Sequence, residues 1–227
     1  MYKVCMSSDS WYPKEATQTI LSNTPEMQTE YVPLANAHGR VLRETIYADR
    51  DYPAFNRVCM DGIIINHTAL QNYRRTFSIQ SVQGAGEKPH TFKTNNACIE
   101  IMTGAAAPHD GSAVIRYEDL LIENGTASVT TSRTIQHNQN IQTKGSDYQK
   151  GAPLLSSGTL LNGIHIGIIA SVGIEKVLVS KKIRTTIIST GTELVPYNTT
   201  PDDYQVRASN HHTLNAFLQS EGLAETT

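Results

Sequence analysis

The spacing of apolar residues predicts a helix close to the beginning of the chain. The run P-K-E-A-T-Q-T-I-L that starts at Pro13 places its apolar residues at helical intervals. Proline is favoured in the first turn of a helix, where its missing N–H has no partner to lose. A second, short helix is expected to end at His38-Gly39, because glycine readily takes the left-handed conformation that stops a helix. Val41–Ala48 then reads as a strand.

A different pattern follows from about Asp51 to Lys144, where short runs of Ile, Val, Thr and Phe are separated by Gly, Asn and Pro. Such runs predict short β-strands in a small sheet or barrel-like module. Asn124-Gly125 predicts a hairpin, because both residues tolerate positive φ. The expected strands are Gly62–Ile65, Phe77–Val82, Cys98–Met102 and Ala113–Tyr117, followed by the hairpin arms Leu121-Ile122 and Ser128–Thr130.

The last part of the chain returns to helical spacing. One apolar face predicts a helix that ends at Gly173, and a strand over Ile174–Ser180 follows it. Thr186–Leu194, T-I-I-S-T-G-T-E-L, reads as a buried strand that runs into a glycine turn. An amphipathic helix is expected from about Ser209 to Ser220, with a stop at Gly222. The apolar face of the helix that ends at Gly173 is predicted to consist of Ile164, Ile168, Ile169 and Val172.

These patterns predict an α+β, multi-domain architecture. A discontinuous helical α/β domain is expected over residues 1–50 and 145–180, with an inserted β-rich, barrel-like domain over residues 51–144. Residues 181–227 read as the truncated start of a three-layer α/β domain, since one βα unit cannot bury its own faces. We therefore expect the chain to be a fragment of a longer protein, or a partner to supply the missing elements.

Composition narrows the classes of function. The 227 residues carry a formal net charge of −2 and a pI near 6.4, and their scattered lysines and arginines argue against nucleic-acid and membrane-surface binding. The apolar runs are too short to span a bilayer. The first residues lack the apolar core of a signal peptide, so a cytoplasmic protein is expected. The cysteines Cys5, Cys59 and Cys98 form no C-x-x-C pair and are expected to be reduced thiols.

Three candidate sites combine glycine or alanine with a polar side chain at an expected strand end. Asp61 in C-M-D-G is suited to hold a metal or accept a hydrogen bond, and its alternative is an ordinary Asp-Gly turn. Thr103 in I-M-T-G-A-A-A-P lies at the edge of a small-residue surface that favours close approach of a backbone or a ligand, or else it belongs to a structural loop. Asp147 in K-G-S-D is the third, and its alternative is a turn in which the carboxylate bonds its own backbone.

A fourth candidate is the segment Ser189-Thr190-Gly191-Thr192-Glu193, which follows an expected strand. Ligands of open α/β sheets bind beyond the carboxyl ends of the strands, and backbone N–H groups in such a turn can hold an oxyanion. Glu193 would repel an anion unless a divalent cation lay between them, so the segment predicts a site for Mg²⁺ and an oxyanion. The eight histidines show no zinc-site spacing, and the sequence contains no P-loop, nucleophile elbow or Rossmann glycine pattern.

Taken in order, six motifs resemble those of the MoeA/gephyrin family, the molybdopterin molybdenumtransferases. The match extends over nearly the whole chain after the first helix, and Arg207-Ala208-Ser209-Asn210 resembles the R-x-S-N that follows in the family. The six motifs are H-G-R-V-L at His38–Leu42, D-Y-P-A-F-N-R-V-C-M-D-G at Asp51–Gly62, I-M-T-G-A-A-A-P at Ile101–Pro108, K-G-S-D-Y-Q-K-G at Lys144–Gly151, G-I-I-A-S-V-G-I at Gly167–Ile174 and S-T-G-T-E-L at Ser189–Leu194.

The resemblance implies an elongated cytosolic homodimer that uses adenylylated molybdopterin, molybdate and Mg²⁺ and yields molybdenum cofactor and AMP. A molybdopterin adenylyltransferase is the implied upstream partner, and residues 181–227 are implied to begin a molybdopterin-binding domain. Small-residue surfaces at Ala105–Ala107 and Gly163–Gly173 are expected to support the dimer. Asp61 and Glu193 are implied to be catalytic and metal-binding, and the implied substrate-binding residues are Thr103, Asp147, Ser189, Thr190 and Gly191.

The chain also departs from the family pattern. The family usually has F-D-x-S-A-M-D-G-Y-A, where this chain has F-N-R-V-C-M-D-G-I-I with Asn56, Val58 and Cys59. Thr192 stands where an Asp is common, and Ser146 where a Glu is frequent. The family's later glycine-serine loop and C-terminal β-domain have no counterpart here, so the chain alone is expected to be inactive. A non-catalytic dimerisation or scaffolding module is the alternative function, and a different α/β nucleotide-processing enzyme is a third.

Overall fold

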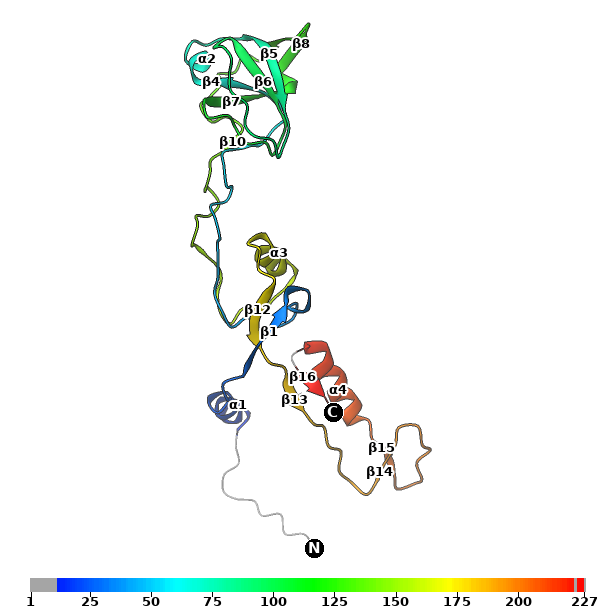
Figure 1. The fold of residues 1–227 in the computed structure, drawn as a ribbon. Coiled ribbons are helices and arrows are strands. Elements are labelled where there is room, and N and C mark those ends of the chain that lie inside the picture. The colour runs from blue at the N-terminus through cyan, green and yellow to red at the C-terminus, as the bar shows by residue number, and fades with distance from the viewer. Residues whose placement is uncertain (1–11, 223, 227) are drawn as a thin grey trace. The chain divides into compact units, whose positions relative to one another are not determined.

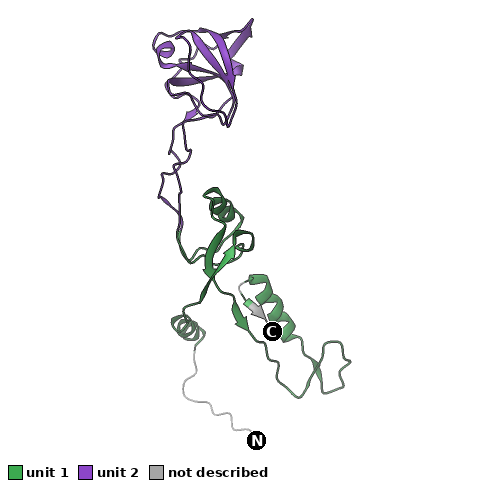
Figure 2. Ribbon diagram, in the orientation of Figure 1, with its two compact units in different colours: residues 1–45, 156–227 green, residues 46–155 purple. Residues whose placement is uncertain are grey.

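The structure is a computed structural model that describes residues 12–222 and 224–226, and this part of the chain divides into two compact units (Figure 2). Unit 1 comprises the described parts of Met1–Thr45 and Ser156–Thr227, and unit 2 comprises Ile46–Leu155. Cys5 and the segment on which the signal-peptide prediction rests lie outside the described residues. Within the described ranges, no helix is both long enough and apolar enough to cross a membrane.

Unit 2 is built on a mixed sheet whose strands follow the order β7-β4-β6-β5-β9-β8 (Figure 1). Neighbouring strands are antiparallel apart from the parallel pair β5 and β6. The edge strands β7 and β8 do not pair with each other within the described chain, so the sheet is an open, curled half-barrel and not a closed barrel. Its elements are β4 (Gly62–Asn66), α2 (His67–Gln71), β5 (Thr76–Gln83), β6 (Ala97–Ile101), β7 (Gly111–Arg116), the 3-10 turn η2 (Tyr117–Asp119), β8 (Leu120–Glu123) and β9 (Thr126–Val129).

The inner strand β4, next to the edge strand β7, separates two apolar cores. All five of its residues, G-I-I-I-N, are buried. Successive side chains of a strand point to opposite faces, so Ile63 and Ile65 pack with Phe77 on one face, while Ile64 packs with Ile99 on the other. Because both faces are covered, the strand reads as a continuous apolar run with no alternation.

The strands predicted for this unit are confirmed to within two residues at their ends. The hairpin at Asn124-Gly125 is confirmed as well, since the two residues have φ of 47° and 74° and join the antiparallel strands β8 and β9. Cys59 and Cys98 are free thiols, as predicted. Burial raises the pKa of the Cys98 thiol to about 12.

Two short ladders join segments of unit 2 that lie far apart in the sequence. β3 (Arg57–Val58) pairs with β10 (Ile141–Gln142), and β2 (Ile46–Tyr47) pairs with β11 (Pro153–Leu155), both antiparallel. These ladders bring the beginning and the end of the unit together, so that residues near position 57 face residues near position 142.

The predicted continuous strand over Val41–Ala48 is wrong. Val41 and Leu42 form isolated bridges to Leu160 and Val179, and a bend separates them from β2. The residues are extended, as their composition predicts, but successive parts of the run have different partners. A single ladder therefore does not form.

The first part of unit 1 centres on the antiparallel pair β1 (Thr29–Pro33) and β12 (Lys176–Ser180), which confirms the strand predicted before Lys181. Arg40, from the H-G-R-V-L run, is only 8% exposed. Its Nη2 donates to the Glu30 carboxylate at 2.5 Å and to the Ser180 carbonyl at 2.6 Å. This buried guanidinium links the two strands.

Three helical segments lie next to these two strands in the sequence, two of them near β1 and one before β12. α1 (Pro13–Ser22) is confirmed, and none of its residues is buried. The second predicted helix is a single 3-10 turn, η1 (Leu34–Asn36), and Gly39 has the expected left-handed conformation with φ of 73°. α3 (Gly163–Ser171) is confirmed, and Gly173 follows it with φ of 75°.

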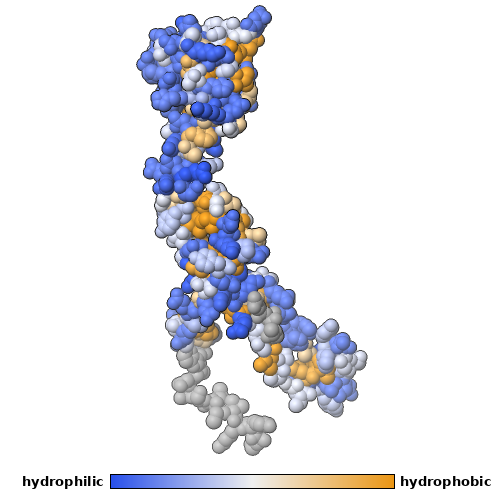
Figure 3. Space-filling model, viewed as in Figure 1, coloured by the Kyte–Doolittle hydropathy of each residue, from blue (hydrophilic) through white to orange (hydrophobic). Residues whose placement is uncertain are grey.

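On the predicted apolar face of α3, Ile169 and Val172 are buried, whereas Ile164 is 75% exposed. Leu160, just before the helix, is 55% exposed. Figure 3 shows apolar residues at the surface in this region of unit 1. Apolar side chains at and just before the start of α3 are therefore exposed to solvent.

The last part of unit 1 contains a βαβ arrangement. β13 (Ile183–Thr185) and β16 (Ala224–Thr226) are parallel, and α4 (Asn210–Glu221) lies between them in sequence. A second short parallel pair consists of β14 (Leu194–Val195) and β15 (Val206–Arg207). The predicted final helix is confirmed, including its stop at Gly222, where φ is 67°.

The predicted buried strand over Thr186–Leu194 is wrong. β13 ends at Thr185, residues 186–190 belong to no strand, and Ile188 is 78% exposed. Within the described residues β13 pairs with β16, and that pairing stops at Thr185. The following apolar residues therefore lie outside the sheet.

Candidate functional site

Asp61 and Thr103, which are 42 residues apart in the sequence, meet at one end of the unit 2 sheet. Asp61 precedes β4 and Thr103 follows β6, and these antiparallel neighbours pair Gly62 with Ile101. The Oδ1 atom of Asp61 accepts the backbone N–H of Thr103 at 2.6 Å and its hydroxyl at 2.8 Å. The register of the sheet thus unites two residues that the sequence singles out separately.

These two hydrogen bonds stabilise the ionised form of Asp61. The backbone N–H of Thr103, and next its hydroxyl, lower the pKa of Asp61 below the ordinary 3.8, against a smaller effect of desolvation. The Oδ2 atom accepts no hydrogen bond from any described residue, so it is available to a ligand. Because the Thr103 hydroxyl gives its hydrogen to Asp61, it can offer a ligand only its oxygen lone pairs.

Replacing Thr103 by valine is expected to raise the pKa of Asp61 towards the ordinary value, while Thr103→Ser leaves it low. Valine removes the hydroxyl bond and keeps the backbone N–H, whereas serine keeps both. The folded pKa lies below the unfolded one, so the contribution of Asp61 to stability is present above about pH 4 and is lost as pH falls through the folded pKa. Carboxyl ¹³C titration measures both pKa values, and equal values in the two variants would contradict the assignment.

The Asp61 carboxylate is a suitable ligand for Mg²⁺, which proteins commonly bind through one or two carboxylates together with substrate phosphates and water. Among the described residues, no group of three or more His, Cys, Asp or Glu side chains could hold a metal ion. A cation at Asp61 would therefore need most of its oxygen ligands from the substrate.

Gly62 is required by the close approach of β7 to β4. A Cβ atom at this position would lie 1.9 Å from the carbonyl oxygen of Ile115. The neighbouring Asp61 carbonyl accepts the backbone N–H of Tyr117 at 3.3 Å. The alternative of an ordinary Asp-Gly turn is wrong, because Gly62 is the first residue of β4. Its lack of a side chain lets the backbone at Ile115 approach closely, and the Tyr117 N–H bonds the Asp61 carbonyl.

The alanines that follow β6 pack against the backbone of β3, as small residues predict. Val58 accepts the N–H of Gly104 and donates to Ala105, both at 2.9 Å, and Ala107 donates to Asn56 at 2.8 Å. Ala105 is fully buried, so the dimer surface predicted over these alanines is wrong at that position. They hold the start of the M-D-G segment in place.

A polar pair beside Asp61 was not predicted from the sequence. The Tyr117 hydroxyl donates to the Glu100 carboxylate. Burial raises the pKa of Tyr117, and the negative charges of Glu100 and Asp61 raise it further. The available signal was the single acid inside the apolar run I-E-I of β6.

Asp147 lies in the turn after β10, and a side chain orients its carboxylate. The Nε2 atom of Gln142 donates to Asp147 Oδ1 at 2.6 Å, and the Ser146 hydroxyl lies 3.5 Å from the same oxygen. The backbone N–H of Asp147 donates to the Tyr52 carbonyl at 3.0 Å. The alternative in which the carboxylate bonds its own backbone does not occur among the described contacts.

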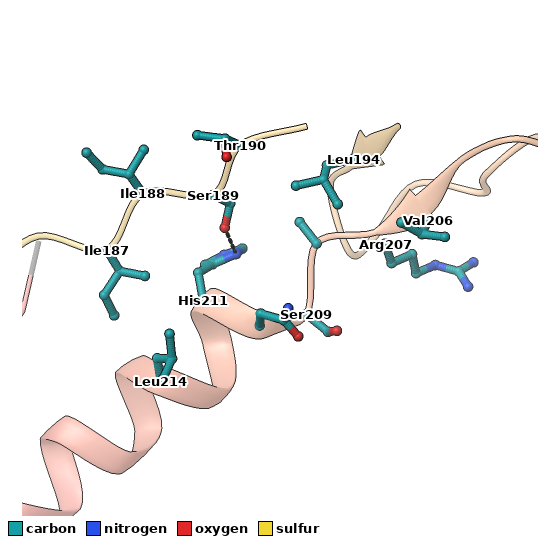
Figure 4. A pocket seen from close by; sticks show the side chains of 12 residues that line it. Ile187, Ile188, Ser189, Thr190, Leu194, Val206, Arg207, Ser209, His211 and Leu214 are labelled. Atoms are coloured by element: carbon teal, nitrogen blue, oxygen red, sulfur yellow. Dashed lines mark hydrogen bonds between the residues drawn. The ribbon is translucent and has the colours of Figure 1, made fainter. Parts of the chain in front are cut away.

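Ser189 and Thr190 line a cavity of about 400 Å³ beside the start of α4 (Figure 4). The Ser189 hydroxyl lies 3.3 Å from Nδ1 of His211. The Arg207 side chain extends away from Ser189, and its Nε donates to the Thr199 carbonyl at 3.1 Å. The cavity therefore presents hydroxyl and imidazole groups beside apolar ones.

Gly191 and Glu193 do not line this cavity. The Glu193 carboxylate lies against Gly191, where a Cβ atom would be 2.5 Å from Oε1. The Glu193 side chain therefore lies at the turn that contains Gly191, outside the cavity that Ser189 and Thr190 line. Asp61 and Asp147 belong to unit 2, whereas Glu193 belongs to unit 1.

Known proteins resemble this chain in sequence. A family model described as the MoeA N-terminal region (domain I and II) matches residues 12–173. A molybdopterin molybdenumtransferase of a Synechocystis species is 36% identical over 207 residues, which cover 91% of this chain and 53% of that protein. The corresponding protein of Haemophilus influenzae is 31% identical, over 90% of this chain and 50% of its own length.

Solved structures agree with the sequence comparison. A molybdopterin biosynthesis MoeA protein from Pyrococcus horikoshii OT3 matches 94% of this chain and 57% of its own, with a TM-score of 0.84 and 29% identity. A second structure from the same species has a TM-score of 0.74 and 27% identity. The chain spans about half the length of these relatives. Because the family model covers more than half of its residues, the chain belongs to the MoeA family.

Proposed function

We propose that this chain acts in molybdenum cofactor biosynthesis, as the part of a molybdopterin molybdenumtransferase that supplies Asp61. The proposed reaction is the Mg²⁺-dependent insertion of molybdate into adenylylated molybdopterin, with release of AMP. The observation that carries the proposal is the Asp61 carboxylate, which Thr103 holds ionised through one oxygen while the other stays available. Membership of the MoeA family supports the choice of substrates.

The residues have distinct proposed roles. Asp61 Oδ2 and the Glu193 carboxylate are each proposed as a contact to Mg²⁺. When bound, Mg²⁺ supplies positive charge that offsets the charge of the substrate phosphates. Thr103 keeps the Asp61 carboxylate oriented, and Asp147 accepts an N–H or O–H group of the substrate. The other proposed substrate-binding residues are Ser189, Thr190 and Gly191.

The proposal includes a homodimer. Residues 1–50 and 145–180 are the proposed linker and dimerisation domain, residues 51–144 the inserted β-rich domain, and residues 181–227 the start of the molybdopterin-binding domain. Exposed apolar side chains at Leu160 and Ile164 support a protein interface near α3. A molybdopterin adenylyltransferase, which would supply the adenylylated substrate, is the proposed upstream partner.

Calorimetric titration of the purified chain with AMP, Mg²⁺ and molybdate tests the proposal. We expect binding that needs Mg²⁺ and that Asp61→Asn weakens at least about tenfold, because a charged acceptor is lost. Asp110→Asn is the matched control, since Asp110 is an acid of the same unit with a side chain that is 75% exposed. Light scattering of the same sample is expected to show a dimer.

Two results would count against the proposal. No binding by a folded dimer would favour the non-catalytic dimerisation or scaffolding alternative. Binding that is unchanged in Asp61→Asn would remove Asp61 from the proposed site.

A further inference from the structure

A chain of side-chain hydrogen bonds leads from Arg57 to Asp147. Arg57 and Gln142 are cross-strand partners in the ladder of β3 and β10. The Nη2 atom of Arg57 donates to Gln142 Oε1 at 2.5 Å, and Gln142 Nε2 donates to Asp147 Oδ1 at 2.6 Å. The carboxamide thus joins a cation on one strand to a carboxylate in the following turn.

The chemistry of its two neighbours fixes the orientation of the Gln142 carboxamide. A guanidinium can only donate hydrogen bonds, and an ionised carboxylate can only accept them. Rotating the carboxamide by half a turn would set its NH₂ against Arg57 and its oxygen against Asp147, so both bonds would be lost. Arg57 therefore reinforces the orientation in which Gln142 presents its NH₂ group to Asp147.

Arg57 itself contacts the aromatic side chain of Tyr52. Its guanidinium carbon lies 5.5 Å from the centroid of the Tyr52 ring, and its Nη1 lies 3.4 Å from the Tyr52 hydroxyl. The Tyr52 ring stacks on Tyr148, with centroids 5.2 Å apart and planes 15° apart. The Tyr52 carbonyl also accepts the backbone N–H of Asp147. The same small group of residues thus holds both the backbone and one carboxylate oxygen of Asp147.

We propose that Arg57 is a positioning residue for substrate binding, which acts through Gln142 to orient the Asp147 carboxylate. Asp147 Oδ2 accepts no hydrogen bond from any described residue, so it is the oxygen that remains to accept an N–H or O–H group. Arg57 occupies the variable position of F-D-x-S-A-M-D-G, and the family resemblance assigns it no role. The inference rests on the proposed function, because it takes Asp147 as a substrate contact.

NMR of the ¹⁵N-labelled chain observes the side-chain NH₂ group of Gln142, whose environment depends on the proposed positioning. Its signals are assigned as those that disappear in Gln142→Leu. Arg57→Met keeps an unbranched side chain over Tyr52 but cannot donate. We expect amide-hydrogen exchange of the Gln142 side chain to become about tenfold faster, the factor that one net hydrogen bond contributes to an equilibrium. Arg57→Lys, which can still donate to Oε1, is expected to restore most of the protection. Unchanged Gln142 signals in Arg57→Met would overturn the inference.

Ligand binding supplies the second test. In calorimetric titrations of the chain with adenylylated molybdopterin and Mg²⁺, Arg57→Met is expected to raise Kd about fivefold to tenfold. The same substitution is expected to have little further effect in Asp147→Ala, because its influence passes through that carboxylate. An equal loss in both backgrounds would contradict a positioning role. Absence of binding by the unaltered chain would count against the proposed function, while the exchange measurement would still decide whether Arg57 orients Gln142.

Discussion

Alanine in place of Asp61 is expected to slow molybdenum insertion by at least about 100-fold. The assay protein is a chimera in which this chain replaces the matched half of the Synechocystis molybdopterin molybdenumtransferase, since the chain spans 53% of that relative. The substitution removes the available carboxylate oxygen and leaves both donor groups of Thr103 without their acceptor. Insertion is measured as AMP released and as molybdenum bound to the cofactor.

Asp61→Asn separates the charge of this side chain from its shape. Its amide oxygen can still accept both bonds from Thr103, so the local structure is expected to persist. We expect nearly the same loss of insertion as with alanine, because the negative charge is missing. Asp110→Asn is the control that keeps the wild-type rate, and circular dichroism checks that each variant folds. Full activity in Asp61→Asn would show that the carboxylate has a structural role alone.

Alanine at Gly62 is expected to destabilise unit 2 by about 3 kcal/mol. The added Cβ would lie 1.9 Å from the Ile115 carbonyl oxygen and 2.8 Å from its carbonyl carbon. These are backbone atoms of the adjacent strand, so β4 and β7 must separate to admit the methyl group. Urea unfolding followed by far-UV circular dichroism measures the change in the free energy of unfolding.

Gly84→Ala is the matched control in the same unit. A Cβ at Gly84 would meet the flexible Glu87 side chain at 3.4 Å, which is an ordinary contact. Its effect is therefore expected to stay within about 0.5 kcal/mol. If the two alanine variants unfold at the same urea concentration, the close approach of β7 does not require glycine at position 62.

Local patterns were sufficient to predict the β-rich unit. Each strand of its six-stranded sheet is a short run that contains apolar residues and is bounded by turn residues, and Asn124-Gly125 specifies the hairpin through backbone conformation alone. The runs over Val41–Ala48 and Thr186–Leu194 have equally suitable compositions, yet neither forms the predicted strand. Whether such a run forms a strand depends on partners that are distant in sequence, such as Val179 for Leu42, and local patterns do not specify them.

The candidate site, too, was only partly predictable from local sequence patterns. Asp61 and Thr103 each stand beside glycine and could be singled out locally, but their hydrogen bonds depend on the register of β4 against β6. Arg57 and Gln142 are ordinary polar residues of two-residue strands, and nothing in their immediate sequence marks them. The role proposed for them follows from cross-strand pairing, which only the fold reveals.

Molybdenum insertion by the chimera that carries the unaltered chain tests the central claim most directly. The claim is that Asp61, held by Thr103, serves the molybdopterin molybdenumtransferase reaction. The account predicts molybdenum incorporation and AMP release that require Mg²⁺ and that disappear with Asp61→Ala. A folded chimera that inserts no molybdenum, or one that inserts it equally well without the Asp61 carboxylate, would contradict it.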